Sequence, residues 1–267
     1  MNRRLFVKTS FLTGSLSALA PAAGFALNES GFQKKSQQEF YELRIYTLKK
    51  EIQQKLVENY FQNALIPAYN RLGIHTVGVF TELKPSGLTK LFIIIPFKNL
   101  PDFFNIEDKL SEDASYIEAG KDYLMAPAAE PAYERIETSL LKAFDHMPVI
   151  ETGDKKSSLF ELRRYESAGE LAAKKKIEMF NSAGEIDIFK RVGLSPVFFG
   201  ETLIGDFQPN LTYMLSFDDM AAHDRTWKLF GSDPEWKRIS SLPEYADAKI
   251  VSRITSTFLI PTVFSQV

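Results

Sequence analysis

Hydrophobic and polar positions alternate along two short segments that share one phrase, aromatic-Glu-Leu-Arg-x-Tyr. The phrase stands as YELRIY at residues 41–46 and as FELRRY at residues 160–165. Alternation with a period of two is typical of a β-strand, because successive side chains point to opposite faces of a sheet. Each copy therefore predicts a strand with Glu, Arg and Tyr on one face and mainly apolar side chains on the other.

The duplication extends well beyond this phrase. RLGI at 71–74 returns as RVGL at 191–194, and the apolar run LFIIIPF at 91–97 returns as LTYMLSF at 211–217. The offset stays at 119 to 120 residues throughout. A constant offset over a whole unit indicates two copies of one domain in tandem.

Each copy predicts the order strand, helix, strand, strand, helix, strand. Apolar residues three and four positions apart indicate the helices, and short alternating or apolar runs indicate the strands. Pro67 predicts a kink or an early end of the first helix. The order is that of a ferredoxin-like β-α-β-β-α-β unit, so the predicted fold class is α+β. The predicted elements are 40–47, 51–71, 74–83, 90–97, 100–124 and 133–143 in the first copy, and 159–165, 169–191, 194–203, 211–217, 218–242 and 250–260 in the second.

The N-terminus predicts export. The segment NRRLFVK at residues 2–8 contains Arg3 and Arg4, the pair expected of a twin-arginine signal, and the apolar stretch after it is too short to span a bilayer. We therefore expect an exported protein, periplasmic or extracellular, with no stable membrane insertion once the signal is removed. The predicted segments are a signal at 1–26, a flexible linker at 27–38, a first domain at 39–146, a second linker at 147–158 and a second domain at 159–267.

Composition and charge exclude several classes of function. The 267 residues are 45% hydrophobic and 25% charged, as is typical of a globular protein, and the formal net charge is −2. Without the three basic residues of the predicted signal the charge is −5, so we expect no nucleic-acid partner. A run of lysines at 174–176 lies in an amphipathic helix and predicts a solvated helix face.

Cysteine is absent, which excludes disulfides, thiolate catalysis and cysteine-based metal sites. The three histidines are His75, His146 and His223, and none lies in a metal-binding motif. By the repeat offset, the counterparts of His75 and His223 are Ser195 and Phe103. We therefore predict no metal site and no cofactor, and we interpret His75 as a polar residue at the start of a strand.

With the repeats aligned, the chain resembles the NIPSNAP family over about residues 39–267. The two copies of the strand phrase carry the resemblance, together with PAYERIETSLL at 131–141 and DPEWK at 233–237. The resemblance implies a dimeric α+β barrel, in which two ferredoxin-like units pack sheet to sheet with their helices outside, and here one chain would supply both units. It implies little chemistry, because barrels of similar fold include cofactor-free monooxygenases, isomerases and haem enzymes.

In such a barrel, one face of each sheet meets the helices and the other lines the interior. We expect the more apolar faces of the two phrase strands to meet the helices and the Glu-Arg-Tyr faces to point into the barrel. Because Arg164 interrupts the apolar row of the second copy, we expect it at a frayed or exposed strand end. The candidate interior residues are Glu42, Arg44, Tyr46, Glu161, Arg163 and Tyr165, with His75 added from the second strand.

Two interpretations of these charges are open. In the first, the Glu and Arg side chains neutralise each other and fix how the two halves dock, since an unpaired buried charge costs several kcal/mol. In the second, the arginines hold a carboxylate or enolate of a small organic ligand while a Tyr or Glu moves a proton. A sizeable interior cavity next to Arg44 or Arg163 would favour the second interpretation.

The sequence therefore supports two classes of function. One is a small-molecule binding or assembly module, favoured by the lack of a recognised catalytic motif. The other is a cofactor-free enzyme, monooxygenase- or isomerase-like, that acts on a small aromatic or carboxylated compound in the barrel interior, favoured by the paired triads and the 13% aromatic content. Either copy could also pair with a copy from another molecule, so a homo-oligomer and an intrachain barrel both stay open.

Overall fold

The structure, a computed structural model, describes residues 37–152 and 157–267. All of its helices and strands belong to one unit of the chain, Ser36–Val267. The predicted export signal, nearly all of the tether after it and a part of the predicted linker 147–158 lie outside the described residues. Within the described ranges, each helix is too short or too polar to cross a bilayer.

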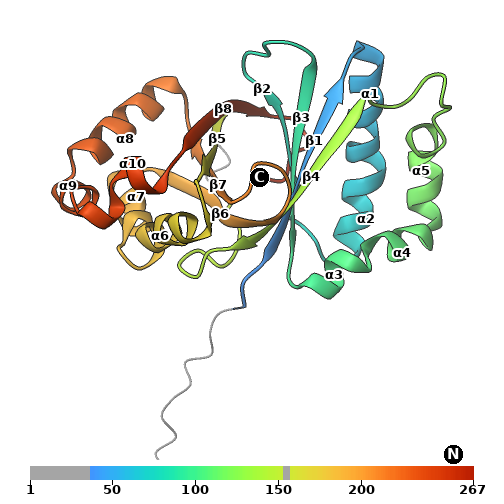
Figure 1. Cartoon of the computed structure of the whole chain (residues 1–267). Coiled ribbons are helices and arrows are strands. Elements are labelled where there is room, and N and C mark those ends of the chain that lie inside the picture. The colour runs from blue at the N-terminus through green and yellow to red at the C-terminus, as the bar shows by residue number, and fades with distance from the viewer. Residues whose placement is uncertain (1–36, 153–156) are drawn as a thin grey trace, which may run out of the picture. The chain divides into compact units, whose positions relative to one another are not determined.

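The first repeat forms a four-stranded sheet with its helices on one side (Figure 1). Its strands are β1 (Phe40–Leu48), β2 (Gly78–Glu82), β3 (Thr89–Phe97) and β4 (Arg135–Ala143). Its helices are α1 (Glu51–Tyr60), the π-helix η1 (Phe61–Leu65), α2 (Ile66–Arg71), α3 (Leu100–Phe104), α4 (Ile106–Ser111) and α5 (Ala114–Leu124).

The second repeat has the same order of elements. Its strands are β5 (Leu159–Glu166), β6 (Ser195–Ile204), β7 (Asn210–Phe217) and β8 (Arg253–Pro261). Its helices are α6 (Glu170–Asn181), α7 (Glu185–Val192), α8 (Met220–Ser232), α9 (Pro234–Ser240), the short 3-10 helix η2 (Pro243–Tyr245) and α10 (Asp247–Ile250). The α+β class and the β-α-β-β-α-β order predicted from the sequence are confirmed.

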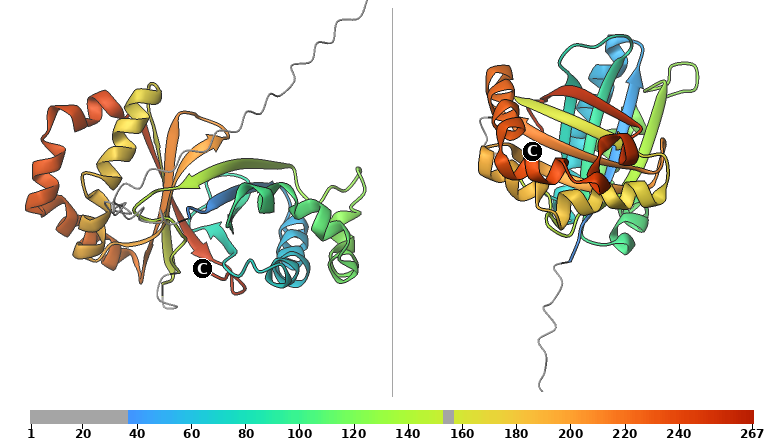
Figure 2. Two further views of the ribbon diagram at one scale, coloured as in Figure 1. Left: turned by 90° about the horizontal axis from the view of Figure 1, so that it is seen from below. Right: turned by 60° about the vertical axis from the view of Figure 1, so that its left-hand side comes forward.

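The two sheets join edge to edge into one closed antiparallel barrel with the strand order β1-β3-β2-β8-β5-β7-β6-β4. One seam pairs β2 with β8, where Phe80 lies opposite Pro261. The other seam pairs β4 with β6, where Leu141 lies opposite Thr202. The barrel is therefore built within one chain, and Figure 2 shows the helices of the two repeats on opposite sides of the strands.

Apolar side chains fill most of the barrel interior, because an eight-stranded barrel is just wide enough for its inward side chains to pack against one another. Two further cores lie between each sheet and its helices, and they include Tyr46 in the first repeat and Tyr165 in the second. The interior core consists of Tyr41, Leu43, Phe80, Phe92, Ile94, Leu141, Ala143, Phe160, Leu162, Val197, Phe198, Met214 and Leu259.

The helices differ from the prediction at their breaks. The segment predicted as one helix at 169–191 is two helices, because Gly184 takes a left-handed backbone with φ 92° between them. Pro67 neither ends nor breaks its helix early: the chain runs from α1 through a π-turn into α2, and Pro67 lies directly after this π-turn. The segment predicted at 100–124 is likewise three helices, the last of which begins after the cap Asp113.

Candidate functional site

The Glu-Arg-Tyr triads lie on the helix-facing side of the barrel wall, not in its interior. Tyr46 and Tyr165 pack into the two sheet–helix cores, whereas Tyr41 and Phe160, one position away from the triads, belong to the interior core. The predicted assignment of strand faces is therefore wrong. Its physical reason is that a closed barrel of this size takes its driest packing inside, while the helix layer can supply polar partners.

In the first repeat, the triad forms a short ion-paired cluster under the helices. Arg44 Nε donates to Glu42 Oε1 at 2.5 Å, and Arg44 Nη2 lies 3.6 Å from Glu107 Oε1. Burial opposes the charge on Arg44, but Tyr69 and Glu42 outweigh burial and raise the pKa of Arg44 above its ordinary value. Glu42 Oε2 and the Tyr69 hydroxyl are buried without a hydrogen-bond partner among the described residues.

Tyrosines complete the first cluster. The hydroxyls of Tyr46 and Tyr123 lie 2.9 Å apart, and those of Tyr60 and Tyr116 lie 2.8 Å apart. The rings of Tyr60 and Tyr123 stack with centroids 3.8 Å apart. Burial is the main cause that raises the pKa of Tyr46 and Tyr60, so these hydroxyls stay protonated at neutral pH. This arrangement is a packed hydrogen-bonded cage.

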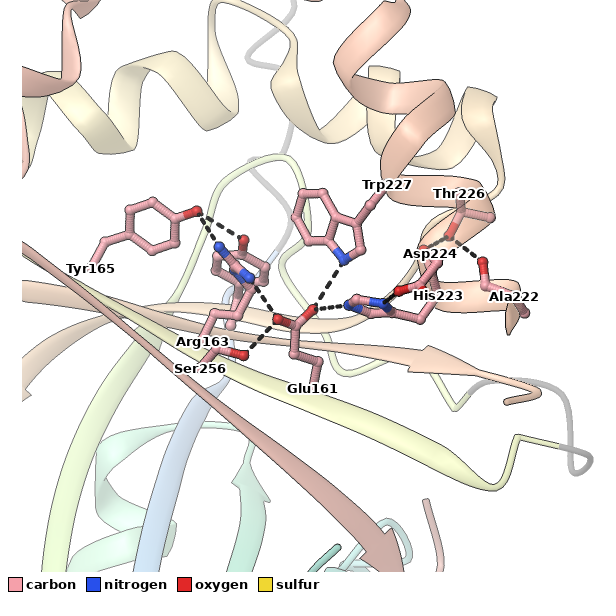
Figure 3. Close-up of polar contacts among 10 residues, drawn as sticks. Glu161, Arg163, Tyr165, Ala222, His223, Asp224, Thr226, Trp227 and Ser256 are labelled. Carbon is pink, nitrogen blue, oxygen red and sulfur yellow. Dashed lines mark hydrogen bonds and ion pairs between the residues drawn. The ribbon is translucent and has the colours of Figure 1, made fainter. Parts of the chain in front are cut away.

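In the second repeat, Glu161 is the centre of a larger network (Figure 3). Its Oε1 accepts from Arg163 Nη1 at 2.5 Å and from Ser256 Oγ at 2.6 Å. Its Oε2 accepts from Trp227 Nε1 at 3.0 Å and lies 3.4 Å from His223 Nε2. The Glu161 side chain is 2% exposed, so both oxygens of a deeply buried carboxylate have partners.

His223 links this buried carboxylate to the surface. Its Nδ1 lies 2.8 Å from Oδ1 of Asp224, whose side chain is 73% exposed. Its ring packs edge-on against Phe217 and Phe258, with centroids 5.0 and 5.1 Å away. A histidine held between two carboxylates has the geometry of a group that accepts and releases a proton.

Arg163 is held by aromatic groups as well as by Glu161. Its guanidinium lies 4.8 Å from the centre of the Trp227 ring, and Nη2 donates to the Tyr165 hydroxyl at 3.1 Å. Burial opposes the charge on Arg163, but the tyrosine oxygens of Tyr213 and Tyr165 outweigh burial and raise the pKa of Arg163. Its Nε is buried with no hydrogen-bond partner in the described part of the chain.

A cavity of about 450 Å³ adjoins the Glu161 network on the outer face of β8. Ser256, which donates to Glu161, lines this cavity together with Phe258, which packs on His223. The first turn of α8 closes one side through Met220, and the hairpin between β2 and β3 closes another through residues 82–86. The second repeat therefore places a buried acid–base network next to open space.

The NIPSNAP family model matches both repeats, over residues 41–147 and 160–266. The chain belongs to the NIPSNAP family. No curated protein matches it. The tandem arrangement predicted from the strand phrase is thus confirmed.

Solved structures similar to this NIPSNAP chain share its fold at low identity. A “putative monooxygenase” of Fusobacterium nucleatum is 9% identical with a TM-score of 0.57, over 85% of this chain and 93% of that one. A “putative monooxygenase” of Lactobacillus acidophilus is 11% identical with a TM-score of 0.55, over 84% and 94%. An “anthrone oxidase-like protein” is 11% identical with a TM-score of 0.51, over 85% and 93%. These likenesses show the barrel fold and no more.

His75 does not join either triad of the NIPSNAP repeats. It lies before β2 rather than at the start of a strand, and it is exposed. It lines a separate cavity of about 300 Å³ with Lys98 and Asp102. The prediction that His75 adds to an interior site is therefore wrong.

The lysine run was predicted as a solvated face, and this is wrong for Lys176. The Lys176 side chain is 3% exposed and lies 3.4 Å from Oε2 of the equally buried Glu185. Its Nζ also faces the rings of Tyr165 and Phe180 at 5.3 and 4.9 Å. Burial raises the pKa of Glu185, and Lys176 opposes that rise.

The described ranges 37–152 and 157–267 contain no group of three or more His, Cys, Asp or Glu side chains placed to hold a metal ion.

The sequence could not identify His223 as part of a site, because its partner Glu161 lies far away along the chain. One signal was available: His223 and Trp227 are four residues apart and share a helix face, which their counterparts Phe103 and Glu107 do not preserve.

Proposed function

We propose that this NIPSNAP protein binds a small aromatic molecule in the cavity beside Ser256, on the outer face of β8. One observation carries the proposal: Ser256 lines the cavity of about 450 Å³ and also donates to the buried Glu161. Met220 and Phe258 add apolar walls, and the hairpin between β2 and β3 adds polar and charged side chains, Lys84 among them. A cavity that combines apolar walls with a few oriented polar groups is typical of small-molecule sites.

The network behind Ser256 supports binding because it preorganises the polar wall. Glu161 fixes the Ser256 hydroxyl, and Glu161 is itself fixed by Arg163 and Trp227. A ligand hydroxyl could donate to Ser256 Oγ while the aromatic body lies against Phe258. Little ordering of the protein would then oppose binding.

Binding is tested with 2-naphthol as the probe, titrated against the purified protein and followed by saturation-transfer NMR. Ser256→Tyr fills the cavity, and we expect it to weaken binding at least tenfold. Thr138→Tyr is the matched control, because Thr138 lies opposite Arg44 as Ser256 lies opposite Arg163. Equal affinity of wild type and Ser256→Tyr, or no binding to the wild type, would refute the proposal.

A second candidate function is proton removal from the bound molecule without a cofactor. The bridging of Glu161 and Asp224 by His223 favours it. The fold neighbour named as anthrone oxidase-like suggests a probe reaction, in which anthrone and dioxygen give anthraquinone and water. The acidic C–H proton of anthrone would pass to His223 by way of Ser256, which lines the cavity, and Glu161, and dioxygen would then oxidise the carbanion.

The test follows anthrone oxidation by visible absorption under air and under nitrogen. His223→Phe copies the first repeat, and we expect it to remove the protein-dependent rate, while Phe103→His in the first repeat leaves the rate unchanged. Circular dichroism checks that both variants fold. A His223→Phe protein that folds and keeps the full rate would show that His223 is not the base.

We also propose that the segment around Arg3 and Arg4 directs export. Its paired arginines followed by a short apolar stretch support this. Replacing both arginines by lysine should retain the protein inside the cell, as cell fractionation would show. Unchanged export of the double variant would contradict the proposal.

A further inference from the structure

A polar row crosses three strands at one end of the barrel interior. Arg164 of β5 lies opposite Thr212 of β7 and Thr255 of β8, so the three residues stand side by side in the sheets. They share the inward face with Leu162, which belongs to the interior core. Arg164 is thus not at a frayed strand end, as the sequence suggested, but inside the rim of the barrel.

This row lines a cavity of about 300 Å³ at the barrel mouth. A smaller pocket of about 60 Å³ adjoins it and shares Arg164 and Thr212 as walls. The opposite wall is apolar and comes from the first repeat, through Ile45 and Phe92. The cavity therefore has a hydroxyl- and guanidinium-bearing side and a hydrocarbon side.

Arg164 is positioned with part of its guanidinium unused. Nε and Nη2 both donate to Glu166 Oε1, at 3.2 and 3.0 Å, and the guanidinium lies 4.1 Å from the centre of the Phe207 ring. Nη1 makes no hydrogen bond to any residue that the structure describes. Across the row, Thr255 Oγ1 is buried and also lacks a partner within the described ranges. Unused donors on a fixed arginine next to an unsatisfied hydroxyl indicate a missing polar partner.

The loop that carries Phe207 is held in an unfavourable conformation. Phe207 has φ 60°, which is uncommon for a residue other than glycine, and its side chain is 55% exposed. The Asn210 side chain donates to the carbonyls of Asp206 and Phe207, both at 3.1 Å. Backbone strain that surrounding contacts maintain is characteristic of ligand clamps. Here the strain holds an aromatic ring over Arg164 at the cavity mouth.

The first repeat shows that the polar row is a specific feature of the second. The position of Arg164 is taken by Ile45 in the first strand phrase, and Ile45 lies opposite Phe92 and Glu137. One barrel end therefore combines a cationic wall from one repeat with an apolar wall from the other. The rim adds Lys90, which makes no ion pair within the described part of the chain, as well as Glu137.

We propose that the barrel mouth binds a small organic carboxylate. The carboxylate would accept from Arg164 Nη1 and from the Thr255 hydroxyl, while the hydrocarbon body lies against Ile45 and Phe92. A carboxylate fits better than a phosphate, because the site offers one free guanidinium edge and the acidic side chains of Glu82 and Glu137 at its rim would repel a second negative charge. This site lies on the other face of β8 from Ser256, since Thr255 and Ser256 point to opposite faces of that strand, and the two cavities share only Glu82 and Thr257 as walls.

The test measures benzoate binding by isothermal titration calorimetry, with the isosteric neutral molecule benzamide as the probe control. We expect benzoate to bind the wild type and benzamide to bind at least tenfold more weakly. Arg164→Ile, which copies the first repeat, should weaken benzoate at least tenfold. Arg225→Ile removes the same charge from an exposed helix position and should leave the affinity unchanged.

A second variant tests the proposal in case Arg164→Ile fails to fold. Thr255→Val keeps the shape of the side chain and removes only the unpartnered hydroxyl, so we expect a severalfold loss of benzoate affinity in a folded protein. Benzoate binding that is unchanged in Thr255→Val, or benzamide binding equal to that of benzoate, would overturn the proposal. Ser256→Tyr should leave benzoate binding intact, which separates this result from the test of the proposed function.

Discussion

The two repeats place the same triad on the same face of the same strand and then surround it differently. Glu42 of the first repeat has one ion-paired oxygen and one buried oxygen without a described partner. Glu161 of the second repeat has partners on both oxygens. The helices that cover each triad make the difference, since α8 supplies His223 and Trp227 in the second repeat, whereas α3 and α4 supply Phe103 and Glu107 in the first. The strand phrase is therefore shared by the two repeats, whereas the helices packed over it differ.

The same contrast extends to the first helix of each repeat. Lys176 stands where the first repeat has Val57, at the repeat offset, and both side chains are buried. The second repeat therefore contains two ion-paired groups under its helices, whereas the first contains one together with a cage of tyrosine hydroxyls. Charged networks cost desolvation energy that a tyrosine cage avoids, so stability alone does not account for them.

The largest expected effect is an unequal cost of removing the two triad glutamates. Glu161→Ala strands a buried guanidinium and the Trp227 N–H, and we expect a loss of about 4 kcal/mol in the free energy of unfolding. Glu42→Ala should cost about 2 kcal/mol, because Arg44 keeps Glu107 and an unsatisfied oxygen is removed. Urea unfolding followed by circular dichroism measures both. Equal losses would show that the extra partners of Glu161 contribute nothing.

The next effect concerns the buried Lys176–Glu185 pair. Lys176→Met leaves Glu185 buried alone, and we expect a loss of about 3 kcal/mol at neutral pH. Because burial raises the folded pKa of Glu185 above its unfolded value, its ionisation costs stability as pH rises through that interval, and more so without Lys176. The free energy of unfolding of Lys176→Met should therefore fall more steeply than that of the wild type as the pH rises above the unfolded pKa of Glu185. Glu185→Gln in the same background should remove the extra slope, and its persistence would contradict the assignment.

The fold could be predicted from the sequence because its evidence is local and doubled. Strand alternation and the constant offset between copies are visible in the chain itself, and the order of elements followed from them. The inward face could not be read this way. Both faces of β1 are buried, one by the barrel core through Tyr41 and one by helices through Tyr46, so alternation distinguishes two faces without saying which is inside.

The candidate site was predicted only in part for a related reason. The pairs of Glu42 with Arg44 and of Glu161 with Arg163 join residues two positions apart on one strand, which a sequence pattern reveals. His223 and Ser256 contact Glu161 only in the folded chain, so no spacing in the sequence predicts these contacts. The prediction of a solvated Lys176 was wrong because a run of lysines is typical of an exposed helix face, whereas Lys176 lies on the buried face of α6.

A smaller effect should be shared by the two repeats. Asp113 caps α5 and pairs with Arg71, just as Asp233 caps α9 and pairs with Arg191. Hydrogen bonds from these arginines are the main cause that lowers the pKa of both aspartates. Their folded pKa values lie below the unfolded ones, so the stability they add is present above the unfolded pKa and is lost as pH falls through the folded pKa.

Asp113→Ala and Asp233→Ala should therefore lower the melting temperature by similar, small amounts at pH 7 and by less at pH 2 to 3. Differential scanning calorimetry at the two pH values measures this. The two aspartates serve as the reference for the unequal glutamates, because each caps a helix and pairs with one arginine, although Arg191 also pairs with Glu235. A large difference between the two aspartate variants would mean that the repeats differ in overall stability and not only in their triads.

The smallest effect expected is that of His75→Ser, which gives the first repeat the residue of the second. His75 is exposed and makes no hydrogen bond or ion pair to any residue the structure describes, so the free energy of unfolding should change by less than about 0.5 kcal/mol. The affinities of the His75→Ser variant for 2-naphthol and benzoate should equal those of the wild type. If His75→Ser weakened the binding of either ligand while His223→Phe did not, the binding chemistry would belong to the first repeat. The difference between the helices that pack over the two triads would then concern packing alone.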